Sequence, residues 1–453
     1  MGPVDPRGSG ESLTGRSYRV RNLYICLQAH TILHFTTISP LANDKHISLF
    51  SCVLQFMASP KRRRDGSGSS GAGAGVAATS ASPTIPDELM IEILSRVPVK
   101  ALMRFRCVSK YWNSFVFDPN LVKLHLQRSP RDNPILYTLS EYDEFDDDAH
   151  FLHRSSTQRL LQNPPSVVGN QEDGVPVFAN YANYDVVGVC NGLVCLSRLH
   201  TNLDEIWVRF WNPATRFSSD ESPSCYIEYG CANMAFGHDA STDTYKVVAA
   251  VMSDYKCHKI ELRVHNLGDD CWREIPTSYA DFPVEFRQPK GVFLNGTLNW
   301  VAVAELGTGN SESFVDFCFD VASESYTCFK LPDDVGEGFS ELGVFGGCLC
   351  LSHIYHRESF AFWQMKEFGV HESWTLLMNI SYDYFEFPRY LIPRPLCLSE
   401  DGNILILVCH AEYQLVRCNR RALQIEHFEI PHKWVSLKST DYVESLVLPY
   451  RTT

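Results

Sequence analysis

The sequence contains no run of 18 apolar residues, so it offers no candidate for a membrane-spanning helix. None of its 16 cysteines forms a CxxC pair, which excludes a zinc finger or a compact disulfide framework of common spacing. Scattered thiols favour a reduced, intracellular protein. Basic residues are few, with 40 Lys and Arg against 53 Asp and Glu, a net charge of −13. The sequence therefore predicts no membrane binding and no nucleic-acid binding.

Motifs of catalysis and of nucleotide binding are also missing, because there is no GxSxG, HExxH or Walker-type loop, and GxGxxG spacing occurs only within the Gly/Ser/Ala segment 66–83. The segment 348–350, Cys-Leu-Cys with His353 nearby, fits a strand with both thiols on one face better than a metal corner. His238 and Asp239 fit the entry to a hairpin turn better than an acid–base pair. We predict no catalytic residue, no metal site and no cofactor.

An acidic run holds six carboxylates within residues 141–148. It lacks the Gly and Glu spacing of an EF-hand loop. A Ca²⁺ loop and a site for a basic partner are the alternatives, and we interpret the run as a solvated loop.

The first 83 of the 453 residues differ from the rest of the chain. They carry nine basic and four acidic residues, a net charge of +5, which leaves −18 for the remainder. Met57 begins a segment that looks like a fresh protein start, and we hypothesise that residues 1–56 are an upstream extension or a gene-model artefact rather than a targeting peptide. Residues 66–83 are rich in Gly, Ser and Ala and predict a flexible linker, so we expect residues 1–83 to be disordered or spurious.

A basic run just before this linker has two interpretations, a nuclear import signal or a solvated tail. We expect a location in the nucleus, the cytoplasm or both. The run consists of Lys61, Arg62, Arg63 and Arg64.

Helical signals fill residues 84–129. Pro86 suits the start of a first helix, and Pro98 ends it. A second helix is expected over about 99–107, a third after a Ser109 cap, and a fourth after Asp118. About 45 residues cannot bury so much apolar surface alone. The pattern predicts a small helical module that docks on a partner, or else a cap on the following domain.

The residues of this module, IPDELMIEILSRVPVKALMRFRCVSKYWNSFVFDPNLVKLHL, resemble an F-box in its plant form. The resemblance implies binding to a Skp-type adaptor and, through it, to a cullin–RING ubiquitin ligase. It does not separate adaptor contacts from the module's own core, and Trp112 is the best anchor candidate because it is large and amphipathic. The candidate contacts are Pro86, Leu89, Ile93, Leu94, Leu102, Phe105, Val108 and Trp112.

Residues 130–453 carry a repeat of about 50 residues. Pairs of apolar runs flank a turn at Gly192, Gly296, Gly347 and Gly402, and a fifth hairpin is expected near Asp243. Between these hairpins lies a strand that ends in Asn or Asp. A turn follows it, and the returning strand carries an aromatic residue. This second pattern recurs every 54 residues at Asn212, Asn266 and Asp320, and it recurs again at Asn419.

Two hairpins per repeat predict a mainly β fold, a β-propeller with one four-stranded blade per repeat. Five copies are visible, and residues 131–185 are long enough for one more. We predict six blades, with five or seven as alternatives. The alternating segment 441–450 is expected to complete the first blade and so close the ring.

This region resembles the plant F-box-associated interaction domain, which is related to kelch-type propellers. The motifs that carry the resemblance occur in family order behind the F-box. Full kelch signatures are missing, so kelch is an architectural analogy here. The motifs are WNPATR, YKVV, LNGTLNW, FDVASESY, GGCLCLS, ESWTLL and YVESLV.

Together these resemblances imply a non-catalytic substrate receptor of an SCF-type ubiquitin ligase, with the F-box on the adaptor and the propeller holding an unidentified target protein. The alternatives are a ubiquitin-independent nuclear protein-binding scaffold and a propeller enzyme. We expect target recognition in loops on one rim of the propeller. Candidate loops are 268–271, 305–313 and 332–339.

Overall fold

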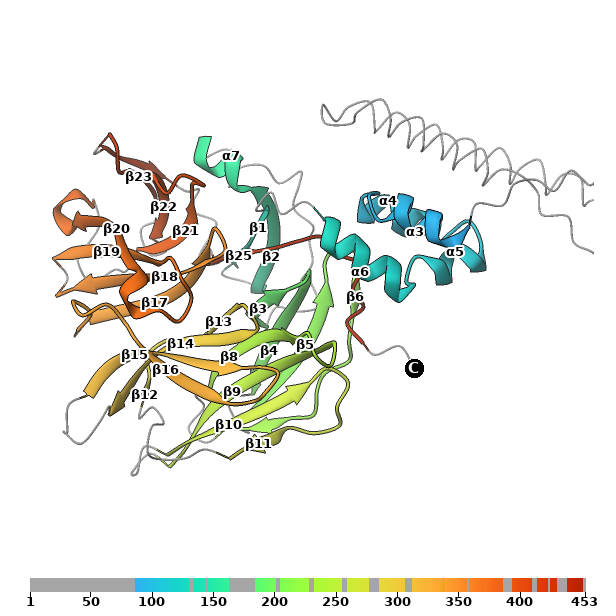
Figure 1. The fold of residues 1–453 in the computed structure, drawn as a ribbon, viewed down its shortest axis with the longest axis horizontal. Helices are drawn as coiled ribbons and strands as arrows, with labels where there is room; N and C mark the ends of the chain where they lie inside the picture. The colour runs from blue at the N-terminus through green and yellow to red at the C-terminus, as the bar shows by residue number, and fades with distance from the viewer. Residues whose placement is uncertain are drawn as a thin grey trace, which may run out of the picture. The chain divides into compact units, whose positions relative to one another are not determined.

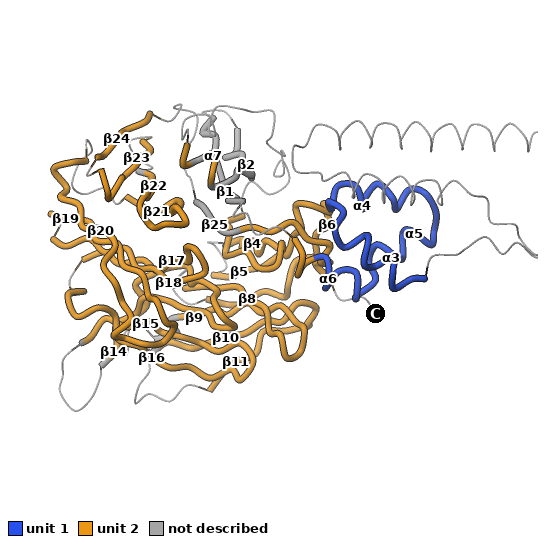
Figure 2. Tube along the Cα trace, turned by 45° about the horizontal axis from the view of Figure 1, so that its top comes forward, with its two compact units in different colours: residues 1–125 blue, residues 126–453 orange. Residues whose placement is uncertain are grey.

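The computed structural model describes residues 86–129, 134–143, 146–162, 184–200, 204–227, 232–254, 259–276, 285–305, 312–336, 338–356, 358–385, 393–409, 414–422, 424–429 and 438–450. The chain divides into two compact units, residues 1–125 and residues 126–453 (Figure 2). The interpretations of Met57, of the basic run at 61–64 and of the Gly/Ser/Ala segment all fall outside the described residues.

Four helices follow one another in the first described range, and the last of them crosses the boundary between the units. They are α3 (Asp87–Leu94), α4 (Val99–Phe105), α5 (Lys110–Phe115) and α6 (Pro119–Arg128). Prolines stand directly before α3, α4 and at the start of α6, where a missing N–H is harmless. The Ser109 hydroxyl accepts from the Trp112 amide at 3.3 Å, and the Asp118 carboxylate accepts from the Asn120 amide at 2.9 Å. The predicted helices and both predicted caps are confirmed.

The module has a core of its own. Leu94, Leu102 and Leu121 are fully buried. Trp112 packs between two phenylalanines, with ring centroids 5.9 Å from Phe105 and 6.0 Å from Phe115. Helices α4 and α5 thus meet at one aromatic cluster, and this packing holds the short helices in position.

The second unit is built from six antiparallel sheets within the described residues (Figure 1). Sheet 1 holds β1 (Pro134–Asp143), β2 (Asp146–Ser156) and β25 (Lys438–Asp441). Sheet 2 holds β3 (Asp185–Cys190), β4 (Leu193–His200), β5 (Glu205–Asn212), β6 (Phe217–Ser218) and β7 (Cys225–Tyr226). Sheet 3 holds β8 (Ala232–Asp239), β9 (Thr244–Asp254), β10 (Lys259–Asn266) and β11 (Arg273–Ile275).

Sheets 4 to 6 continue the same meander. Sheet 4 holds β12 (Glu285–Phe286), β13 (Val292–Leu294), β14 (Thr297–Glu305), β15 (Glu312–Asp320) and β16 (Tyr326–Lys330). Sheet 5 holds β17 (Gly338–Phe345), β18 (Cys348–Tyr355), β19 (Ser359–Met365) and β20 (Trp374–Ser381). Sheet 6 holds β21 (Arg394–Leu398), β22 (Ile404–Cys409), β23 (Gln414–Asn419) and β24 (Gln424–Glu429). Short helices α7 (Thr157–Gln162), η3 (His371–Ser373) and η4 (Tyr382–Tyr384) lie in the connections.

One strand of each sheet contacts one strand of the next, and these contacts form a closed cycle. The order is β3, β8, β13, β17, β21, β25 and back to β3. A cycle of this kind leaves no sheet at an open end of the series, as in a propeller. The count of six blades stays a prediction, because sheet 1 has three strands within the described residues where a full blade has four.

The expected hairpin turns are present in the structure. Asn295 and Gly296 have φ of 51° and 83°, the left-handed pair that a two-residue turn between twisted strands requires. Gly192, Gly347 and Gly402 occupy the corresponding turns of sheets 2, 5 and 6. The fifth hairpin turns at Asp243, as predicted.

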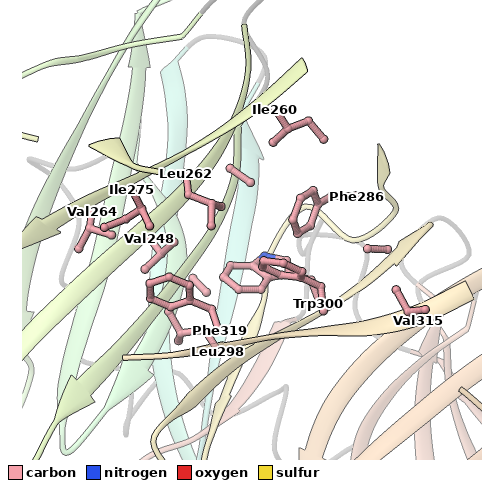
Figure 3. Packing of buried hydrophobic residues seen from close by; sticks show 14 of the residues in the cluster. Val248, Ile260, Leu262, Val264, Ile275, Phe286, Leu298, Trp300, Val315 and Phe319 are labelled. Carbon is pink, nitrogen blue, oxygen red and sulfur yellow. The ribbon is translucent and has the colours of Figure 1, made fainter. Parts of the chain in front are cut away.

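A large core cluster lies between sheets 3 and 4 (Figure 3). Trp300 of β14 is fully buried there, with Phe286 and Phe317 at centroid distances of 5.9 Å and 6.0 Å. Its indole covers Gly291 so closely that a Cβ on that residue would lie 2.4 Å from the ring. The cluster fixes the spacing of two neighbouring sheets.

The predicted role of the segment 441–450 needs a correction. The strand that joins sheet 1 is β25, which pairs with β1 from Thr138↔Lys438 to Ile135↔Asp441. The residues after Asp441 are not a strand. They are anchored instead by Asn212, whose amide nitrogen donates to the Ser445 and Val447 carbonyls at 3.0 and 2.8 Å. The alternation of apolar and polar residues in this segment arises because Tyr442 and Leu446 are buried, although the segment forms no strand ladder.

The acidic run at 141–148 also differs from the prediction of a loop. The antiparallel ladder of β1 and β2 extends to Asp143↔Asp146, so most of the run belongs to the two strands of a hairpin. Acidic residues have low strand propensity, but the two strands are already paired over most of their length. The ladder therefore continues into the acidic residues.

Candidate functional site

Two apolar side chains of the helical module are strongly exposed, Leu89 on α3 and Tyr111 on α5. Their exposed fractions are 55% and 43%. The helices that carry them are joined by a hydrogen bond, because the Tyr111 hydroxyl donates to the Asp87 carboxylate at 2.8 Å. We call the exposed side of α3 that carries Pro86 and Leu89, three residues apart, the docking face.

The eight residues predicted as adaptor contacts fall into three groups by exposure. Leu89 and Pro86 are exposed, and Ile93 and Val108 are half-buried. The other four are buried in the module: Leu94, Leu102, Phe105 and Trp112. The adaptor contacts themselves stay predictions.

Trp112 was the preferred anchor, yet only 8% of it is exposed. Its ring lies against Phe105 and Phe115. An aromatic side chain in this pattern suits a core as well as an interface, so sequence alone did not separate the two roles. The buried position indicates that Trp112 supports the module's own core.

Sequence reasoning missed Tyr111, which stands between the Lys and Trp of the Lys-x-Trp motif. Its ring stacks on Phe115 at a centroid distance of 5.4 Å and an interplanar angle of 22°. Partial burial of the phenol, together with the hydrogen bond to Asp87, raises the pKa of Tyr111 to about 12. The available signal was an aromatic residue directly beside Trp112 on a six-residue helix.

In the second unit, several motif residues hold sheets together. Lys246 of the YKVV motif is almost fully buried and its ammonium donates to the Val321 carbonyl at 2.6 Å. It also pairs with Asp239 at 3.0 Å and with Glu324 at 2.9 Å. Burial alone would raise the pKa of Asp239, but hydrogen bonds from Ser241, Lys246 and Thr242 hold it well below its usual range. This ion cluster joins sheet 3 to the β15–β16 turn of sheet 4.

Other motif residues close turns. The Asn212 side-chain oxygen of WNPATR accepts from the Ala214 amide at 2.9 Å, and Asp320 of FDVASESY accepts from the Ser323 amide at 2.7 Å. Asn212 is the last residue of β5, and Asp320 is the last residue of β15. These motifs therefore describe the architecture, and they do not mark a binding site.

The groups that resembled chemical sites have structural roles. His353 and Ser340 form a hydrogen bond of 2.7 Å, but both side chains are buried, which leaves no access for a substrate. Burial, and to a lesser extent the charge of His356, lowers the pKa of His353 to about 4. Cys348 and Cys350 lie on one face of β18, opposite His353, as predicted. Within the described ranges no group of three or more His, Cys, Asp or Glu is placed to hold a metal ion, and no helix is long and apolar enough to cross a membrane.

The strand directions assign the candidate target loops to rims. Residues 268–271 connect the third and fourth strands of sheet 3, β10 and β11, so they share a rim with the Gly hairpins. β14 ends at Glu305 and β15 begins at Glu312, while 332–336 follows β16 and β17 begins at Gly338. Since neighbouring strands are antiparallel, these strand ends belong to the opposite rim. Residues 306–311 and 337 of the candidate loops lie outside the described residues.

The chain thus combines a helical module that exposes apolar side chains with a closed cycle of antiparallel sheets. Comparison with known families agrees: the F-box domain model matches residues 83–124, and the F-box associated beta propeller domain model matches residues 135–387. The chain belongs to the plant F-box proteins that carry an F-box-associated β-propeller domain.

Individual relatives and a solved structure give the degree of likeness. The chain is 31% identical over 345 residues to the F-box/kelch-repeat protein At3g23880 of Arabidopsis thaliana, which covers 74% of this chain and 88% of that protein. It is 27% identical to the F-box protein CPR1 of the same plant, over 72% of this chain and 79% of that one. The periplasmic gluconolactonase PpgL of Pseudomonas aeruginosa aligns over 68% of this chain and 99% of its own, with 8% identity and a TM-score of 0.38.

Proposed function

We propose that this protein is the substrate-receptor subunit of an SCF-type ubiquitin ligase. In this function the F-box binds a Skp-type adaptor and the propeller holds a target protein. The observation that carries the proposal is the docking face, where Leu89 stays exposed although the module has an apolar core of its own. Large apolar side chains exposed on a small module are typical of a partner surface.

The function needs no bond-making by this chain. The receptor raises the effective concentration of the target's lysines near the ligase. The buried state of the Ser340–His353 pair supports a non-catalytic role. For the target we favour the rim that carries the loops 305–313 and 332–339, because two of the three candidate loops belong to it.

Adaptor binding is tested by calorimetry with the full chain and a purified plant Skp-type adaptor. Leu89→Asp puts a charge on the docking face and is expected to weaken binding more than tenfold. Leu376→Asp is the matched control, since Leu376 is an exposed leucine on β20, and its affinity is expected to equal that of the wild type. Equal binding by Leu89→Asp would reject this docking face, and failure of the wild type to bind would reject the function.

Targets are sought by affinity purification of the whole protein beside a version that lacks residues 84–129. Proteins captured by both versions are expected to be targets, and the proteins lost from the shorter version are expected to be ligase subunits. Loss of no protein on deletion of the F-box would favour a ubiquitin-independent scaffold.

A further inference from the structure

The start of α3 has little of its own to hold it in place. Pro86 provides no side-chain cap, and the helix has only eight residues, with Met90 and Leu94 as its buried members. Asp87, Glu88 and Leu89 of the first turn are all exposed. A short helix with an uncapped first turn frays unless a tertiary contact fixes it.

Besides the burial of Met90, the first turn has such a contact in the hydrogen bond from the Tyr111 hydroxyl to the Asp87 carboxylate, at 2.8 Å. The phenol ring is itself fixed, because it stacks on Phe115 and meets the edge of Trp112 at a centroid distance of 6.0 Å. The buried aromatic cluster is thereby connected through Tyr111 to the first turn of α3, two residues before Leu89.

We infer that Tyr111 is a positioning residue for adaptor binding: it holds the first turn of α3 so that Leu89 is presented in its docking orientation. This inference rests on the proposed function. The hydrogen bond between Tyr111 and Asp87 lies at the surface. When a substitution removes it, water bonds to the remaining polar group, so the free energy of unfolding changes little. The ordering of the first turn is lost, and the adaptor must then restore it on binding.

The test measures adaptor affinity and thermal unfolding for variants of the full chain. Tyr111→Phe keeps the stacked ring and removes the hydroxyl, and it is expected to weaken binding roughly fivefold with an unchanged midpoint of thermal unfolding. Asp87→Ala is expected to give the same loss. Asp87→Asn retains an acceptor oxygen and is expected to bind within about twofold of the wild type, as a conservative rescue.

Two further variants complete the design. The double variant Tyr111→Phe with Asp87→Ala is expected to lose no more than either single variant, because both changes remove the same bond. Glu88→Ala, the neighbouring acid of the first turn, is the matched control and is expected to bind as the wild type does.

Three results would overturn the inference: wild-type affinity of Tyr111→Phe, additive losses in the double variant, or a fall in unfolding midpoint that accounts for the lost binding. These results all require that the wild type binds the adaptor. An absence of wild-type binding would overturn the proposed function and the inference together.

Discussion

Asp316 in β15 is a buried acid whose carboxylate has no hydrogen-bond partner in the described part of the chain. We expect its replacement to change how stability depends on pH. The side chain is fully buried, and neither carboxylate oxygen has a hydrogen-bond partner among the described residues. Its neighbours across the ladder are Val301 and Phe329. Val315 and Phe317 point into the cluster of Figure 3, so Asp316 points to the opposite face, towards sheet 5. Desolvation raises its pKa to about 8.

The direction of the pH effect follows from this raised pKa. The folded protein keeps a proton that the unfolded chain releases above about pH 4. Stability is therefore lost as the pH rises from about 4 to about 8, at about 1.4 kcal/mol per pH unit for this one group. Asp316→Asn has nearly the same shape and no titrating proton. The stability of the variant relative to the wild type is expected to increase by about 2.7 kcal/mol between pH 5 and pH 7.

The assay is urea unfolding of both full-length proteins at pH 5, 6 and 7, followed by tryptophan fluorescence. Asp270→Asn is the control, because Asp270 is an exposed acid and its difference from the wild type is expected to stay constant. A stability difference between Asp316→Asn and the wild type that is the same at pH 5 and pH 7 would refute the reasoning.

Three further substitutions test other parts of the molecule. Trp112→Ala is expected to destabilise the F-box helices by about 3–5 kcal/mol, seen as a lower midpoint in circular dichroism, and an unchanged midpoint would place the ring outside the core. Lys246→Met leaves Asp239 buried without its cation and is expected to lose about 3–5 kcal/mol in urea unfolding, with recovery when Asp239→Asn is added; no recovery would contradict the ion cluster. His353 has a pKa of about 4 in the folded state, below its ordinary value, so its contribution is full above pH 6.5 and is lost as the pH falls to 4. His353→Gln is expected to flatten this fall of stability at acid pH. An equally steep fall in the variant and the wild type would contradict the role assigned to His353.

Sequence predicted the elements well where one residue type imposes a conformation. Pro86 marked the start of a helix and Pro98 the end of one, because proline lacks the N–H that a helix interior needs. Gly296 marked a left-handed turn, because few other residues adopt a positive φ. Each of these signals is local, so it survives without knowledge of tertiary contacts.

The predictions failed or stayed open where tertiary contacts decide. Trp112 and Leu89 belong to the same apolar pattern, yet one is buried and the other exposed, and only the packing of four helices separates them. The role of Tyr111 depends on Asp87, which lies 24 residues earlier in the chain. The closing strand lies at 438–441 and not at the predicted 441–450. Residues after Asp441 alternate between apolar and polar as a strand would, but Tyr442 and Leu446 are buried in irregular chain.

The pairing of β25 with β1 has a consequence for how the protein is made. Ile135 and Asp441 are partners across the ladder, although 306 positions separate them. During synthesis, β1 emerges from the ribosome long before its partner, and five sheets must be made in the interval. Until β25 arrives, nascent β1 keeps an open edge that neighbouring chains can pair with. A premature stop codon even a few dozen residues early would therefore yield a chain that aggregates or requires chaperones, rather than a slightly shortened receptor.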